Sequence, residues 1–109
     1  MKIDERMNNY FVGISIYVGE FEKATYTIIT DAPSYADAAR YALLLECHNS
    51  PDRLEWKDNY EYVEDGLDFI YDVNSVAKIG KSIKPFIDAG MSSYRYDDKV
   101  LSQANLPRA

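Results

Sequence analysis

Four stretches of the chain alternate apolar with polar residues, and this alternation constrains the fold more than any other feature. The stretches begin at Tyr10, Ala24, Arg53 and Leu67. A two-residue period is typical of β-strands that bury one face and leave the other polar. The first two strands, 10–18 and 24–30, are separated by the short segment 19–23, which predicts a hairpin. The chain must therefore build a sheet and cover one face of it.

One helical pattern separates the second and third strands. Ser34 followed by Asp37 is a helix-start signature, because the hydroxyl caps free N–H groups and the acid lies in the positive first turn. We expect a helix from about Tyr35 to His48, ended by Asn49-Ser50-Pro51-Asp52. Its buried stripe is predicted to comprise Ala38, Ala39, Ala42 and Leu45, widened by Leu43 and Leu44.

The next two strands form an acidic hairpin around the turn signal Glu64-Asp65-Gly66. On a strand from about Arg53, one face is predicted to carry Leu54, Trp56, Tyr60 and Tyr62, and the other Glu55, Lys57 and Glu61. After the turn, Leu67, Phe69, Tyr71 and Val73 share one face. Asp68 and Asp72 share the opposite face with Ile70. We expect one side of this hairpin to join the core and the other to be mostly carboxylate.

The C-terminal third is predicted to be more helical. Asn74-Ser75 could cap a short helical turn that reaches Ile79, and Ser82 lies near the start of a second helix whose first turn tolerates Pro85. Gly90 is a plausible helix stop. A short strand through Tyr94 and Tyr96 and an exposed tail complete the prediction.

Together these elements predict an α+β fold in ββαββα order. The sheet is expected to have four to five antiparallel strands, with helices packed on one face. The chain of 109 residues has room for a single domain, 1–109. Within it, 1–9 and about 98–109 are expected to be less ordered.

The charge of the chain is concentrated in one segment. The net charge is −6, and residues 55–72 alone hold seven acids and one base. The remaining residues balance, with eleven acids and eleven bases. Direct nucleic-acid binding is disfavoured, because it requires positive charge to neutralise phosphates.

The acidic hairpin is the candidate partner-binding site. Like charges across a hairpin repel each other, so the concentration of acids has a cost that a binding role would explain. Carboxylates interleaved with tyrosines suit an Arg- or Lys-rich protein surface. The predicted contact residues are Glu55, Asp58, Tyr60, Glu61, Glu64, Asp65, Asp68 and Asp72. The alternative is that the acids only keep a solvent-facing strand soluble and unpaired, as in a housekeeping or oligomeric accessory domain.

No catalytic, cofactor-binding or metal-binding residues are predicted, and we expect the chain not to be an enzyme. Cys47 and His48 are adjacent on a helix, so their side chains diverge by about 100° and do not form a nucleophile–base pair. Gly80-Lys81-Ser82 resembles the end of a phosphate-binding loop, but Ser75 stands where that loop needs a glycine. The stretch around Gly66 is no EF-hand loop, because Val63 replaces an oxygen ligand.

The single cysteine excludes an internal disulfide. The first residues lack the apolar run of a signal peptide, and no apolar stretch approaches the ~20 residues that span a bilayer. We therefore expect a cytoplasmic protein without membrane contact. A homodimer is compatible with the sequence.

In general character the chain resembles the small acidic proteins with which phages block host defences, anti-CRISPR proteins among them. The features that carry the resemblance are the short chain, the absence of catalytic motifs and the segment Trp56-Lys57-Asp58-Asn59-Tyr60-Glu61-Tyr62-Val63-Glu64-Asp65. Small immunity proteins that plug basic toxin sites share this character. The resemblance implies a partner such as a nuclease or another nucleic-acid-binding complex, met in the host cytoplasm, whose basic surface is occluded by carboxylates. It transfers no individual site residues.

Overall fold

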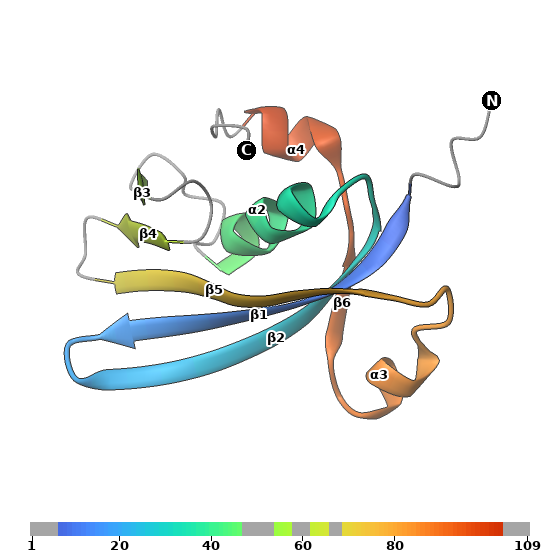
Figure 1. Ribbon diagram of the computed structural model, residues 1–109, viewed down its shortest axis with the longest axis horizontal. Helices are drawn as coiled ribbons and strands as arrows, with labels where there is room; N and C mark the ends of the chain where they lie inside the picture. The colour runs from blue at the N-terminus through green and yellow to red at the C-terminus, as the bar shows by residue number, and fades with distance from the viewer. Residues whose placement is uncertain (1–6, 47–53, 58–61, 66–68, 104–109) are drawn as a thin grey trace.

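A computed structural model describes residues 7–46, 54–57, 62–65 and 69–103. The described strands form one sheet in the order β3-β4-β5-β1-β2-β6, and Figure 1 shows how the helices lie around it. The strands are β1 (Asn8–Val18), β2 (Phe21–Ala32), β3 (Leu54–Lys57), β4 (Tyr62–Asp65), β5 (Phe69–Ile79) and β6 (Ser92–Arg95). The helices are α2 (Tyr35–Glu46), α3 (Lys84–Asp88) and α4 (Asp98–Gln103).

The β1–β2 hairpin is longer and its turn tighter than the sequence predicted. Val18 pairs directly with Phe21, so only Gly19 and Glu20 form the loop. Gly19 has a φ of +60°, which suits the first loop position of a II′ turn. Because β2 begins at Phe21, the predicted connection 19–23 is mostly strand.

Helix α2 confirms the predicted cap and ends within the described residues at Glu46. Ser34 Oγ accepts a hydrogen bond from the backbone N–H of Asp37 at 3.1 Å. The buried part of α2 differs from the predicted stripe, because it adds Arg40 and Tyr41, while the predicted Leu45 is only partly buried. Arg40 is 1% exposed, and its Nη1 lies 3.3 Å from Asp37 Oδ1.

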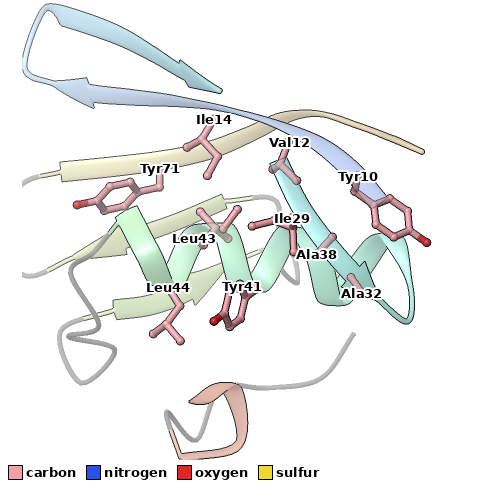
Figure 2. Packing of buried hydrophobic residues seen from close by; sticks show 11 residues of the cluster. Tyr10, Val12, Ile14, Ile29, Ala32, Ala38, Tyr41, Leu43, Leu44 and Tyr71 are labelled. Carbon is pink, nitrogen blue, oxygen red and sulfur yellow. The ribbon is translucent and has the colours of Figure 1, made fainter. Parts of the chain in front are cut away.

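The core lies between α2 and the central strands. Figure 2 shows Ile14, Val12, Ile29 and Tyr71 on the side of the sheet that faces this helix. The small side chains of Ala38 and Ala42 let the helix approach the sheet closely. The buried cluster comprises Tyr10, Val12, Ile14, Ile29, Ala32, Ala38, Tyr41, Ala42, Leu43, Leu44 and Tyr71.

Strand β5 corrects the prediction of a helical turn after Asn74-Ser75. The strand continues to Ile79 and pairs antiparallel with β1 along its whole length. The register shifts opposite Gly13 and Ile14, so Asn74 is an extra residue in β5. Asn74 and Ser75 occupy space that Gly13, which has no side chain, leaves free. Polar residues that could have capped a helix therefore form a β-bulge.

The predicted single strand from Arg53 to Tyr62 is wrong. The chain forms two short strands, β3 and β4, which pair antiparallel through Leu54↔Asp65 and Lys57↔Tyr62. Asp58 and Asn59 are residue types that favour turns, and this signal could have located the reversal. The predicted hairpin between β4 and β5 is confirmed, since Glu64 pairs with Ile70. Glu64 and Asp65 lie in strand β4 rather than in the turn.

The C-terminal elements correct the antiparallel prediction. Strand β6 runs parallel to β2, so the sheet is mixed. The predicted helix around Pro85 is confirmed as the five-residue α3, and Gly90 follows it with a φ of +94°. In Figure 1, α4 lies beside α2, whereas α3 lies on the other side of β5 from α2. Helix α4 occupies part of the stretch for which a tail was predicted.

The structure thus confirms the α+β fold. The sheet is mixed rather than antiparallel throughout. The described elements follow the order ββαβββαβα, whereas the order ββαββα was predicted. None of the described helices is both long and apolar enough to cross a bilayer.

Candidate functional site

The candidate site lies on the face of the sheet turned away from α2, which we call the outer face. Alternation along the three central strands assigns its residues, because Val12, Ile14 and Tyr71 point to the core. The outer face therefore carries Phe11, Gly13, Ser15 and Tyr17 of β1, Tyr26 and Ile28 of β2, and Ile70, Asp72 and Ser75 of β5.

Asp72 is the candidate acid whose side chain the structure describes. It is half-buried, lies opposite Ser15 and forms no ion pair within the described part of the chain. Ile70 shares its face, as the sequence predicted. Asp72 therefore offers a carboxylate on the outer face that no described cation neutralises.

Three further candidate acids lie on described strands, and the backbone register places them. Glu55 pairs directly with Glu64, and Glu64 pairs with Ile70 of β5. These residues form one row across the sheet that ends at Tyr17, the partner of Ile70 on β1. Asp65 pairs with Leu54 and belongs to the alternate row. Asp58, Tyr60, Glu61 and Asp68 lie outside the described residues.

A neighbouring row contains both Asp72 and the one basic residue of the segment, with one residue between them. Lys57 pairs with Tyr62, Tyr62 with Asp72, and Asp72 with Ser15. Glu55 and Glu64 thus stand directly opposite each other in the first row. In the second row, Lys57 lies two strands away from Asp72. The register concentrates like charge rather than alternating it.

Aromatic rings extend the outer face beyond the acids. The rings of Phe11 and Tyr26 are 5.5 Å apart, and Tyr26 is 51% exposed. Tyr26 lies directly opposite Gly13, so its ring occupies the space above a residue without a side chain. Tyr17 is half-buried at the acidic end. The outer face therefore combines exposed aromatic surface with carboxylate.

The bulge in β5 places a polar cluster between the acids and the aromatic rings. Asn74 Nδ2 donates a hydrogen bond to Ser15 Oγ, and Ser75 Oγ lies 3.4 Å from Asn74 Oδ1. Ser15 is only 3% exposed, whereas Asn74 is exposed. This cluster was not predicted from the sequence, although Gly13 within an alternating strand is a known signal for a bulge or a close approach.

Of the remaining tyrosines, two belong to the interior. Tyr10 and Tyr41 are buried, and burial raises the pKa of both hydroxyls above the ordinary value. Tyr41 packs against Tyr96, with ring centroids 5.3 Å apart. Tyr94 is exposed and lies on β6, away from the acidic rows.

Other chemistry considered from the sequence finds no support in the described residues. Among them, no group of three or more His, Cys, Asp or Glu is placed to hold a metal ion. Gly80 and Lys81 lie in the loop between β5 and α3, where Lys81 Nζ donates to the Met7 carbonyl at 3.1 Å. Cys47 and His48 lie outside the described residues.

A comparison with protein-family models, curated proteins and solved structures found no match to this chain.

Proposed function

We propose that this chain is a binding protein that occludes a basic surface of another protein, and that the outer face is its contact surface. The observation that carries the proposal is the juxtaposition of acid rows with aromatic rings, of which Tyr26 is exposed, on one face of the sheet. Such a face is chemically suited to recognising arginine and lysine side chains.

The charge distribution supports a localised contact. Residues 55–72 hold seven acids and one base, which equals the net charge of the whole chain. A solubility role requires only that charges be spread over the surface, with both signs interspersed. A concentrated negative field instead accelerates encounter with a positive partner and suppresses encounters with acidic ones.

The register adds an energetic argument. Glu55 and Glu64 are directly opposite each other, an arrangement that is unfavourable in the isolated sheet. A cationic side chain docked between them would relieve this repulsion. The backbone register of these two acids therefore favours a partner that brings positive charge.

The aromatic residues supply the other half of a recognition surface. Tyrosine is enriched at the centre of interfaces, and arginine stacks on aromatic faces while its guanidinium pairs with carboxylates. Tyr26, Phe11 and Tyr17 lie on the same face as Asp72, so one partner could meet both chemistries.

The partner class follows from the charge and from the resemblance to anti-defence inhibitors. A protein with a basic nucleic-acid channel, such as a nuclease complex, presents arginines and lysines that normally bind phosphates. The carboxylates of the outer face would engage the same side chains. An anti-defence inhibitor carried by a phage or mobile element is the biological role that this reading favours.

The proposal is tested with a triple variant of the acid rows. Glu55→Gln, Glu64→Gln and Asp72→Asn together remove three charges while keeping size and hydrogen-bonding capacity. Partners are first captured from host lysate at low and high salt and identified, and affinities are then measured with the purified partner. We expect the variant to bind tenfold to a hundredfold more weakly, about 1.4 to 2.7 kcal/mol, and with a weaker salt dependence.

A matched control removes the same charge elsewhere. Asp88, Asp97 and Asp98 are exposed on or beside α3 and α4, and all three are changed to Asn. If the control weakens binding as much as the acid-row variant, only the total charge matters and the localised site is wrong. If neither variant changes binding, the acids serve solubility and the accessory-domain alternative holds.

A further inference from the structure

Strand β2 is covered along only part of its outer edge. Strand β6 pairs with β2 from Thr27 to Thr30. The preceding residues of β2, 21–26, pair with β1 on one side, and no described strand pairs with them on the other. Among the described elements this leaves a sheet edge of six residues without a paired strand, which we call the β2 edge.

The hydrogen-bonding groups at the β2 edge can be assigned from the backbone. Tyr96 N–H donates to the Thr30 carbonyl, so Thr30 points toward the β6 side. Alternate residues of a strand point the same way, which directs Glu22, Ala24 and Tyr26 to this side. The two-residue turn agrees, because its flanking residue Phe21 bonds toward β1. The N–H and C=O groups of Glu22 and Ala24 and the N–H of Tyr26 therefore face away from β1, whereas the parallel pairing of Thr27 with Ser92 engages the Tyr26 carbonyl.

Side chains around the β2 edge give it a chemical preference. Phe21 is 80% exposed and Tyr26 51% exposed, and Glu22, Lys23 and Ala24 are exposed as well. Glu46 reaches the edge from α2, since its Oε2 accepts a hydrogen bond from Thr25 Oγ1 at 2.9 Å. With Glu20 and Glu22, three acids flank this segment against Lys23 alone.

A second copy of the chain does not fit this edge. Two-fold antiparallel pairing centred on Lys23 would set two like charges opposite each other. Pairing centred on Ala24 would place Phe21 of the second copy opposite Thr27, where Ser92 of β6 already lies. The occupant that satisfies both charge and space is an extended segment of another protein.

We propose that the β2 edge receives an extended, basic segment of the partner as an added strand. The segment's main chain bonds to Glu22, Ala24 and Tyr26, and its lysine or arginine side chains meet Glu22 and Glu46. This mode of strand addition gives affinity through the main chain and selectivity through alternate side chains. The inference rests on the proposed function in that it takes the same basic partner, and it names a second, separate contact.

The experiment uses an end-blocked peptide of the repeat Lys-Lys-Thr-Thr, about eight residues long, which spans the edge and presents lysines on both faces of the added strand. Amide hydrogen exchange is followed by NMR on the full chain with and without the peptide. In the free protein, Glu22, Ala24 and Tyr26 should exchange fast and Lys23 and Thr25 slowly. Peptide binding should slow the first three by about tenfold or more and leave the other two unchanged.

Ala24→Pro provides the matching variant. The substitution removes an N–H that bonds to nothing in the described sheet, so the fold should persist, as proline is tolerated at sheet edges. Peptide affinity should fall at least tenfold, whereas Ala24→Ser, which keeps the N–H, should bind like the wild type. A peptide N-methylated at alternate residues should lose binding to the wild type, independently of any variant.

Three outcomes would overturn the inference. The amides of Glu22, Ala24 and Tyr26 could already be protected in the free protein, which would show that the edge is covered. The glutamate version of the peptide could bind equally well, which would refute the charge preference. Binding could survive both Ala24→Pro and N-methylation yet be lost in the acid-row variant, in which case the outer face alone binds and the proposed function stands without the added strand.

Discussion

Gly13 shows how one missing side chain organises the outer face. Tyr26 covers it from β2, and Asn74 and Ser75 approach it from the bulge in β5. A cross-strand aromatic ring compensates for the weak packing of a glycine within a sheet. The residue therefore links the aromatic part of the outer face to the polar cluster.

Replacing Gly13 with alanine should destabilise the protein by about 1–3 kcal/mol, the usual cost of overpacking. An added Cβ would lie 2.5 Å from Ser75 Oγ and 2.9 Å from Asn74 Oδ1. Urea unfolding measures the change. Gly80→Ala is the control, because no atom lies within 4 Å of a Cβ there, and its effect should stay within about 0.5 kcal/mol. Equal effects at both positions would contradict the packing argument.

At the level of the element, α2 depends on its N-cap. Ser34 satisfies the N–H of Asp37, and its hydroxyl also donates to Asp37 Oδ2 at 3.0 Å. The described helix reaches Glu46, the predicted end at His48 lies outside the described residues, and α2 supplies most of the helical side of the core.

Ser34→Ala should cost about 0.5–2 kcal/mol of folding free energy, since it leaves an N–H of the first turn without its partner. Ser34→Thr should preserve most of the stability, because its hydroxyl can still accept from the Asp37 N–H and donate to the Asp37 carboxylate. Thermal unfolding monitored at the helical circular dichroism band compares the two. Equal stability of Ser34→Ala and the wild type would mean that the cap contributes nothing.

The elements also show what a single sequence can and cannot predict. β1, β2, α2 and the β4–β5 hairpin follow from local periodicity and from the Ser34 cap. The parallel pairing of β6 could not be predicted, because it depends on contacts between residues more than 60 positions apart. The Asn74-Ser75 pair was wrongly predicted to cap a helix, because the same polar residues can also form a β-bulge. The bulge forms here because Gly13, on another strand, leaves space for it.

The candidate site was predicted in part. The alternation of Ile70 and Asp72 placed them on a common face, and the structure agrees. The split of one expected strand into β3 and β4 changed the partners of the acids and set Glu55 against Glu64. Phe11, Tyr26 and the bulge were not among the predicted contacts, because their meeting depends on the register of three strands.

At the level of the whole molecule, two of the buried tyrosines, Tyr10 and Tyr41, couple folding to alkaline pH. Burial raises the pKa of Tyr10 and Tyr41 above the ordinary value of about 10. Below that pH both folded and unfolded chains keep these protons, and the full stability is present. Above it the unfolded chain releases them first, so stability falls as pH rises through the folded pKa values.

Urea midpoints should therefore decrease between pH 9 and pH 11. The double variant Tyr10→Phe and Tyr41→Phe should show a smaller decrease, because phenylalanine has no proton to lose. Tyr26→Phe plus Tyr94→Phe, which alters two exposed residues, serves as the control and should retain the wild-type pH dependence. Parallel pH profiles for the buried pair and the wild type would refute the coupling.

The position of β1 has a consequence for the growing chain. It is the first described strand to be synthesised, yet it lies between β5 and β2, and its pairs with β5 join residues 51 positions apart (Val18 with Phe69) to 70 apart (Asn9 with Ile79). A ribosome adding roughly 5–20 residues per second leaves one side of this strand unpaired for several seconds. Contacts so distant in sequence also slow folding after release. In the nascent half-sheet, β1 therefore exposes an unpaired strand edge of the kind that favours aggregation.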